Sequence, residues 1–281
     1  MPRPSVADKR RAFRDLHATG CFVIPNPWDV GSARYLQSLG FKALASTSSG
    51  FAWSQAQADT AVGVDVVLAH LAEIVAATDV PVNADFEGGY ADEPAGVARN
   101  VTRCCETGVA GLSIEDSTGD KDKPLYDIPF AVERMKAARA AIDKAGAEVL
   151  LTGRAEGFIA GVPDLDQMIA RLRAYAAAGA DCLYAPGIRT RDQIEAVVNA
   201  VAPKPVNFLN GGPLGHTVAD LAAMGVRRIS VGGALARSAW GGFMRAARLI
   251  AEQGSFEGFK EAASGAELNG IFSKDQAARE A

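Results

Sequence analysis

The sequence predicts an α/β fold, a closed (β/α)₈ barrel of the TIM type. Short apolar runs alternate with helical stretches along most of the 281 residues, which is typical of βαβ units around a parallel sheet. Four of the helical stretches end in the same way, with a glycine just past the last turn: Gly40, Gly108, Gly179 and Gly225. A doubly wound open sheet is the alternative. It would typically show a Gly-x-Gly-x-x-Gly turn after the first strand, where this chain has Pro25-Asn26-Pro27.

Eight short apolar runs are predicted as strands because runs of this length between turn signals suit a buried parallel sheet. In chain order they are residues 21–24, 43–46, 82–85, 111–114, 149–153, 181–184, 206–209 and 228–231. Each run is followed by a stretch with helical periodicity. These stretches cover about residues 30–39, 64–77, 94–107, 129–145, 164–178, 191–201, 218–224 and 234–253. Eight such pairs are what a (β/α)₈ barrel requires.

No linker of low complexity divides the chain, so a single domain is predicted. The barrel covers residues 1–254, and residues 255–281 form a C-terminal helical extension of the same domain. We expect this extension to hold a short helix or two and to end in a charged, frayed segment from Lys274 onward.

Composition excludes several classes of partner. The net charge is -4 and no basic run is present, which argues against nucleic acid. No apolar stretch approaches the roughly 20 residues that a membrane helix needs, so no membrane partner is expected. The first residues are polar and lack the apolar core of a signal peptide, so a cytoplasmic location is expected.

Cysteine and histidine are not predicted to carry the chemistry. The four cysteines lack metal-ligand spacing and are interpreted as reduced, mostly buried thiols. Of the three histidines, His17 and His70 are expected on helices, and His216 follows a glycine-rich turn where it could begin a helix.

The segment from Val80 to Tyr90 begins as a buried strand and ends in two acids, Asp85 and Glu87, followed by two glycines. Residues two apart in a strand point to the same side, so both acids face one cavity if the extended backbone continues that far. Such a pair repels itself unless a cation lies between, and a divalent cation with oxygen ligands meets that need. The alternative is that both acids are solvated, or that Asp85 caps the next helix.

Polar residues gather where the predicted strands end, which is where barrels carry their chemistry. They are Asn26, the run 46–50, Asp85 with Glu87, Glu115 with Asp116, Arg154 with Glu156, Asn210, and Gly232-Gly233. Acids abut the third and fourth strands, and an arginine ends the fifth. This arrangement suits a metal held by carboxylates, with a substrate carboxylate held by Arg154 and by donors of residues 47–50.

These residues resemble the isocitrate lyase/phosphoenolpyruvate mutase superfamily over nearly the whole chain. The resemblance rests on Phe41-Lys42-Ala43-Leu44 before the Ser/Thr/Gly loop, on Asp59, and on three longer segments. The segment 83–90 is similar to the D-x-D-x-G-(Y/F)-G motif of the superfamily, with Glu87 as the second acid. Residues 108–116 and 153–158 match two further signatures in the right order.

The resemblance implies roles for individual residues. Asp85 would ligate Mg²⁺, with Mn²⁺ as the alternative, and Glu87 and Glu115 would complete the metal set. The expected catalytic residues are Arg154, Glu115 and Asp59. The expected substrate-binding residues are Asn26, Thr47, Ser48, Ser49, Arg154 and Asn210.

The implied reaction is that of a Mg²⁺-dependent lyase or decarboxylase. It breaks a C–C bond next to the carbonyl of a small 2-oxo or 2-hydroxy acid through a metal-stabilised enolate. An oxaloacetate-like substrate is the simplest case, because decarboxylation needs no dedicated acid for the leaving group. The lyases of the superfamily carry a cysteine and a histidine in the loop after strand four, and residues 117–127 contain neither. This departure argues against cleavage of isocitrate or methylisocitrate by the usual route.

Three other functions stay open at this stage. Lys121 and Lys123 give the loop a partial similarity to that of a C–P bond enzyme, such as phosphonopyruvate hydrolase or phosphoenolpyruvate mutase. The pairs Gly211-Gly212 and Gly232-Gly233 could bind the phosphate of an isomerase or synthase substrate, although tight turning also explains them. A barrel that binds a 2-oxo acid without turnover is the third.

The resemblance also implies a homo-oligomer, a dimer or a tetramer. Its subunits would exchange the last barrel helix, the apolar-rich helix around residues 240–244. An ordinary eighth barrel helix fits this stretch equally well.

Overall fold

The computed structural model describes residues 3–280 and forms one sheet of eight parallel strands. The strands are β1 (Phe22–Ile24), β2 (Leu44–Ala45), β3 (Val82–Asp85), β4 (Gly111–Glu115), β5 (Leu150–Arg154), β6 (Cys182–Tyr184), β7 (Val206–Leu209) and β8 (Arg228–Ser230). They run in the order β1-β8-β7-β6-β5-β4-β3-β2. The two ends of the sheet meet where the Ala45 N–H donates to the Pro25 carbonyl at 3.1 Å. The prediction of a (β/α)₈ barrel is confirmed.

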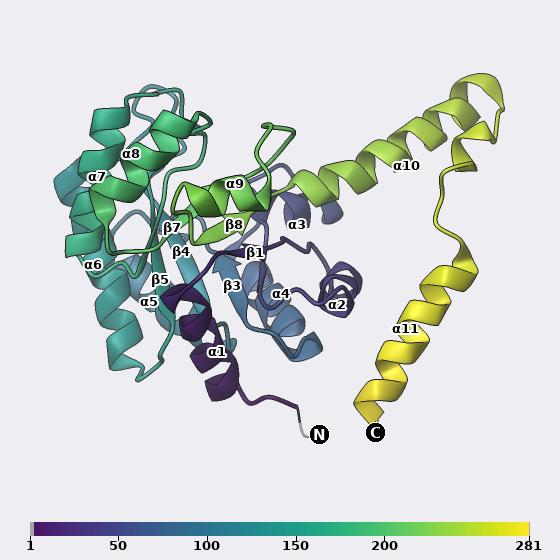
Figure 1. Ribbon diagram of the computed structural model, residues 1–281, viewed down its shortest axis with the longest axis horizontal. Coiled ribbons are helices and arrows are strands. Elements are labelled where there is room, and N and C mark those ends of the chain that lie inside the picture. The colour runs from purple at the N-terminus through teal and green to yellow at the C-terminus, as the bar shows by residue number, and fades with distance from the viewer. Residues whose placement is uncertain (1–2, 281) are drawn as a thin grey trace.

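Helices alternate with these strands, and in Figure 1 most of them lie around the sheet while α10 and α11 extend away from it. They are α1 (Val6–Ala18), α2 (Val30–Ser38), α3 (Ser48–Ser54), α4 (Val64–Ala77), α5 (Pro94–Glu106), α6 (Ile128–Lys144), α7 (Leu165–Ala177), α8 (Arg191–Val201), α9 (Val218–Ala223), α10 (Ala234–Gln253) and α11 (Gly265–Glu280), with a short 3-10 turn, η1 (Glu257–Phe259). The predicted helix-ending glycines all adopt the left-handed conformation, with φ of +88°, +88°, +103° and +86° at Gly40, Gly108, Gly179 and Gly225. Each therefore has a backbone conformation that residues with a Cβ atom rarely adopt.

The barrel interior is unusually polar. Arg228 is buried at 3 % exposure, and neutral acceptors surround its guanidinium. Its Nε–H donates to Asn207 Oδ1 at 2.7 Å, and its Nη2–H donates to Thr152 Oγ1 at 3.1 Å. Barrel interiors are ordinarily filled by bulky branched side chains. The small and polar residues of this barrel leave room for a cavity in its interior.

Helix α1 closes the amino-terminal end of the barrel, and it was not among the elements predicted from the alternating pattern. Phe13 is fully buried there. The His17 ring contacts the Phe13 carbonyl through Nδ1 at 2.7 Å and lies 3.4 Å from Arg228 through Nε2. Burial and the nearby Arg228 lower the pKa of His17 to about 3, so the ring is neutral. His17 therefore lies on a helix, as expected from the sequence, and its ring serves packing.

The C-terminal segment differs from its prediction. Helix α11 runs unbroken through Lys274 to Glu280, whereas a frayed end was expected. Asp275 forms an ion pair with Arg34 of α2, and Arg279 lies 3.6 Å from Asp79. These ion pairs tie the helix to the barrel, which composition alone did not indicate.

Helix α10 leaves the barrel instead of covering it (Figure 1). Of its twenty described residues, only Ala236 is buried. Trp240, Phe243, Met244 and Ile250 are exposed, Phe243 at 63 %. Among residues 3–280, no helix combines the length and the apolar character needed to cross a lipid bilayer.

Candidate active site

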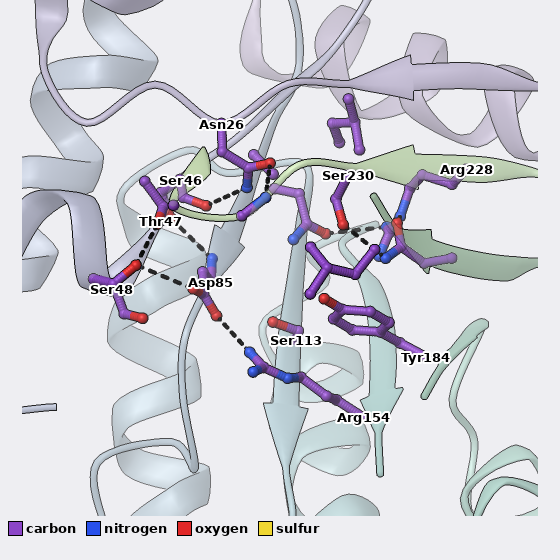
Figure 2. A pocket seen from close by; sticks show the side chains of 18 of the residues that line it. Asn26, Ser46, Thr47, Ser48, Asp85, Ser113, Arg154, Tyr184, Arg228 and Ser230 are labelled. Carbon is purple, nitrogen blue, oxygen red and sulfur yellow. Dashed lines mark hydrogen bonds and ion pairs between the residues drawn. The ribbon is translucent and has the colours of Figure 1, made fainter. Parts of the chain in front are cut away.

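A cavity of about 240 Å³ opens at the carboxyl ends of the strands and reaches into the polar barrel interior (Figure 2). Its walls include these predicted site residues: Asn26, Thr47, Ser48, Ser49, Asp59, Asp85 and Arg154. They come from loops and strands spread over more than a hundred residues of sequence. The barrel topology brings them together, as predicted from the position of each residue after a strand.

Asp85 is the last residue of β3, and three contacts hold it in place. Its backbone N–H donates to Ser46 Oγ at 2.8 Å, and its Oδ2 accepts the Ser48 N–H at 3.0 Å. Its Oδ1 lies 3.1 Å from Arg154 Nη1. The carboxylate is thus oriented into the cavity and has the Arg154 guanidinium beside it (Figure 2).

Arg154, the last residue of β5, is the centre of the charged cluster. Besides Asp85 it pairs with Glu115 Oε2 at 3.0 Å and with both oxygens of Glu156, Oε2 being 3.0 Å away. Its guanidinium also lies over the Tyr184 ring, 5.3 Å from the ring centre. Although burial opposes the charge, Glu115 and Glu156 raise the pKa of Arg154 well above its ordinary value. The arginine therefore stays charged.

The acids around Arg154 are hard to ionise together. Burial raises the pKa of Glu115 well above its ordinary value, and burial also raises the pKa of Glu156. Burial, with a contribution from Asp85, raises the pKa of Asp59. One arginine does not neutralise this many carboxylates. The excess negative charge therefore favours binding of a further cation or protonation of one of the acids.

Glu87 does not lie as the strand pattern predicted. The extended backbone ends at Asp85, and Glu87 adopts the left-handed conformation with φ of +44°. The chain turns here, and the Gly89 N–H donates to the Phe86 carbonyl at 2.8 Å. Glu87 therefore lies outside the cavity wall and accepts the Tyr90 hydroxyl at 3.0 Å. Burial and the neighbouring Asp85 raise its pKa to about 7, so it remains electrostatically coupled to the site.

Asn26 and the segment after β2 form the rim of the cavity. The Asn26 amide donates to the Ser46 carbonyl at 2.8 Å, and its Oδ1 accepts the N–H groups of Val231 and Gly232 at 2.9 Å each. Residues 48–54, predicted as loop, form the short helix α3, because the Thr47 side chain caps it by accepting the Gly50 N–H at 3.3 Å. Asn26 thus has a framework role as well as a place on the wall.

Two groups of residues that the sequence associated with the site lie elsewhere. Asn210 does not line the cavity, and its Oδ1 is buried without a hydrogen-bond partner in the described chain. The loop 117–127 folds back on itself, with the Thr118 N–H bonded to the Pro124 carbonyl at 3.0 Å. Lys121 and Lys123 are exposed, and neither lines the cavity.

Asp116, beside Glu115, belongs to the support of the site. It is buried at 2 % exposure, pairs with Arg171 at 3.0 Å and accepts the Glu156 N–H at 2.8 Å. The Gly232-Gly233 pair has a packing reason, since a Cβ at Gly233 would lie 2.7 Å from Ser49 Oγ. Close packing against Ser49 and Trp53 thus gives one reason for a glycine at this position.

Sequence reasoning missed several wall residues from the barrel interior. Ser113, Tyr184, Asn207 and Arg228 line the cavity. Each lies on a strand two residues before or after another inward residue, so strict alternation along the strands could have found them. The rule that barrel chemistry lies at the strand ends does not include these interior positions.

The residues fit a magnesium site of the open kind. No three His, Cys, Asp or Glu side chains in residues 3–280 form a ready ligand cluster. Mg²⁺ usually keeps several waters and is held by one or two carboxylates and by substrate oxygens, so a complete protein cage is not needed. Asp85 offers such a carboxylate on the cavity wall. The negative charge of the surrounding acids favours binding of a cation there.

Eight parallel strands around a cavity, with acids and one arginine at their carboxyl ends, define a (β/α)₈-barrel enzyme fold with an acid-rich active-site cavity. The chain belongs to the phosphoenolpyruvate phosphomutase family, whose model matches residues 13–251. This match confirms the resemblance seen in the sequence, and it places the chain among lyases and mutases.

Three known proteins show how close this relationship is. A crystal structure of a candidate lyase/mutase from Burkholderia cenocepacia J2315 is 47 % identical, covers 95 % of this chain and 97 % of its own, and has a TM-score of 0.91. The oxaloacetate decarboxylase of Pseudomonas entomophila is 31 % identical over 241 residues, 81 % of this chain and 79 % of its own. Phosphonopyruvate hydrolase, in a complex with oxalate and Mg²⁺, is 25 % identical, with 96 % of both chains covered and a TM-score of 0.81.

The ion pairs of Arg154 lead to a prediction for the stability of an Arg154→Met variant and for its dependence on pH. Removing the guanidinium leaves Glu115 and Glu156 buried without their counter-charge, so the free energy of unfolding should fall by about 3 kcal/mol near neutral pH. The folded pKa values of both acids are raised, so the folded state holds protons that the unfolded chain releases. The stability they contribute is present at low pH and is lost as the pH rises, so the deficit should be larger at about pH 8 than at about pH 5.

Urea unfolding at several pH values measures this deficit. Adding Glu156→Gln to the variant is the matched control, because it removes one uncompensated acid and should recover part of the stability. A deficit that is small and independent of pH would contradict the ion-pair description of the cluster.

Proposed function

We propose that the protein is a Mg²⁺-dependent carbon–carbon lyase or decarboxylase acting on an oxaloacetate-like 2-oxo acid, with Mn²⁺ as the alternative metal. One observation carries the proposal: a charged arginine lies at a cavity wall between Asp85 and further buried acids. An arginine in that position recognises a substrate carboxylate, and a carboxylate beside it suits a divalent cation. The similarity to an oxaloacetate decarboxylase supports the same substrate class.

In this proposal Asp85 holds the metal, and Glu87 and Glu115 hold its water ligands or the side chains around it. The bound metal would supply positive charge at the substrate carbonyl oxygen, where negative charge develops as the C–C bond breaks. Arg154, released from Asp85 by the cation, would bind one substrate carboxylate. Glu115 and Glu156 would keep its guanidinium oriented.

The rim residues would complete the binding of the substrate. Thr47, Ser48 and Ser49 line the cavity with hydroxyl and backbone donors, and Asn26 fixes the backbone behind them. Asp59 also lines the cavity, and its raised pKa makes it suited to hold a proton on its carboxyl group and to deliver it to the product carbon. Asn210 does not line the cavity and would act only through its loop.

C–P bond chemistry is the second candidate, favoured by the family match and by the similarity to phosphonopyruvate hydrolase. The structure offers it little local support, because Lys121 and Lys123 are exposed and do not line the cavity. C–C cleavage is therefore preferred. A barrel that only binds a 2-oxo acid predicts binding without turnover.

A product assay tests the proposed reaction. The purified protein with Mg²⁺ is expected to release pyruvate from oxaloacetate, and both EDTA and Asp85→Ala should lower the rate at least about a hundredfold, since loss of a main electrostatic group costs that much. Asp122→Ala, an exposed acid of the 117–127 loop, is the matched control and should keep full activity.

Phosphonopyruvate belongs in the same assay, with phosphate release as its readout. Phosphate release without pyruvate from oxaloacetate would reassign the protein to C–P chemistry. Metal-dependent oxalate binding with no turnover of either compound would favour the non-catalytic barrel.

We also propose that α10 packs against a second copy of the chain, in a dimer or tetramer. The exposed Trp240, Phe243, Met244 and Ile250 fall at helical spacing on a helix that its own barrel leaves uncovered. An apolar stripe of this kind is seldom left in water by a monomer.

The double variant Trp240→Glu/Phe243→Glu tests this packing, because two charges on the stripe cannot be buried in an interface without a partner. Light scattering should show an oligomer for the parent protein and a monomer for the variant. Glu252→Ala, an exposed change on the same helix, should leave the assembly intact. A monomeric parent protein would refute the proposal.

A further inference from the structure

The inner end of the active-site cavity contains a buried arginine that has no acidic partner. Arg228, the first residue of β8, lines the cavity and is 3 % exposed. Residues two apart along a strand are separated by about 7 Å, so Arg228 lies one layer of side chains deeper in the barrel than Ser230. Figure 2 shows it on the far side of Ser230 from Asp85. The arginine is therefore separate from the acids at the mouth of the cavity.

The hydrogen-bond contacts of this guanidinium are all to neutral groups. Its Nε–H donates to Asn207 Oδ1, and its Nη2–H donates to Thr152 Oγ1. Its Nη1 lies 3.4 Å from both Asn83 Oδ1 and His17 Nε2, which are long contacts. The His17 ring is neutral, because burial and Arg228 lower its pKa to about 3. Within residues 3–280, Nη2 has no acceptor for its second N–H and no carboxylate pairs with Arg228.

A charge in this position lacks compensation. Buried charges are ordinarily paired, because removing an ion from water costs far more than neutral hydrogen bonds return. The thiol of Cys182, which begins the neighbouring β6, does not supply a negative charge, since burial raises its pKa. Asp85 contacts Arg154 instead of Arg228. The folded chain therefore leaves one positive charge at the inner end of the cavity.

The walls beside Arg228 offer hydroxyl donors. Ser113 lines the cavity and is paired in register with Thr152, which accepts from Arg228. Its own hydroxyl has one long contact, 3.3 Å to the Ala84 carbonyl. Ser230 also lines the cavity, and its Oγ accepts the amide of Asn207, the other neighbour of Arg228, at 3.0 Å. A hydroxyl that accepts one hydrogen bond still has its own hydrogen to donate.

We infer that the inner end of the cavity binds a small inorganic anion, held by Arg228 and by the hydroxyls of Ser113 and Ser230. A free monovalent anion such as chloride suits this place, because it balances one charge and accepts hydrogen bonds from every side. The site is separate from the metal and substrate groups proposed above and needs neither of them. A substrate carboxylate that reaches down to Arg228 is the other source of negative charge, and the experiment separates the two.

Diffraction from crystals of the purified protein soaked in sodium bromide tests the inference, because bromide replaces chloride and scatters anomalously. Without added metal, an anomalous peak is expected in contact with the Arg228 guanidinium and with Ser113 or Ser230. A soak that also contains Mg²⁺ and oxalate should retain this peak, with oxalate bound nearer the mouth. Oxalate in contact with Arg228, in place of bromide, would assign the arginine to the substrate and overturn the free-anion site.

Thermal unfolding measures the binding in solution. Exchanging sodium gluconate, whose anion is much larger, for sodium chloride at equal ionic strength should raise the Tm by about 2 °C, because the folded state alone binds the ion. Arg228→Met should lose both this rise and the bromide peak. Ser113→Val keeps the arginine and decides the question if Arg228→Met fails to fold. It should raise the chloride concentration that gives half the rise about tenfold, because it removes one donor to the ion.

Arg227→Met is the matched control. Arg227 precedes Arg228 in the chain and does not line the cavity, so this variant should retain the full rise in Tm and the bromide peak.

Three results would overturn the inference. One is the absence of bromide from Arg228. Another is a rise in Tm that Ser113→Val or Arg228→Met leaves unchanged, since chloride then acts elsewhere. The third is a bromide peak without any rise in Tm, which means binding at crystal concentration only. The product assay with EDTA and Asp85→Ala decides the proposed function separately from all of these.

Discussion

Charge balance around Arg154 is the constraint on which the site depends. One guanidinium lies against Asp85, Glu115 and Glu156 at the carboxyl end of the barrel, in surroundings that disfavour ionised acids. In the proposed function, a cluster held in this way accepts a cation and an anion together. The cation would take over Asp85, and the anion would take over the freed arginine. The family to which the chain belongs, and its similarity to a protein that binds oxalate with Mg²⁺, fit this exchange.

The fold could be predicted because local signals agree with one another along the chain. Strands β3 and β7 have the predicted bounds, since turn residues flank each apolar run, and the glycines at helix ends have the expected left-handed backbone. Two features depend on contacts that sequence spacing does not reveal. The Thr47 side chain turns a predicted loop into α3, and ion pairs to α2 hold α11 in place.

The site could be predicted in outline, because in a barrel the position of a residue after a strand decides where it lies. That rule located Asp85 and Arg154 on the cavity wall. It misplaced Glu87, since alternation holds only while the backbone stays extended and the chain turns after Asp85. It also overlooked Arg228, which lies deeper inside the barrel where apolar residues are the usual filling. The roles of these residues in catalysis are predictions still.

A crystal structure of the protein with Mg²⁺ and oxalate tests the central claim most directly. The account predicts the ion on Asp85 and the oxalate carboxylate on Arg154, with the contact between Asp85 and Arg154 broken. Glu115 and Glu156 should still hold the guanidinium. An ion bound elsewhere, with the Asp85–Arg154 pair intact and oxalate away from both residues, would contradict it.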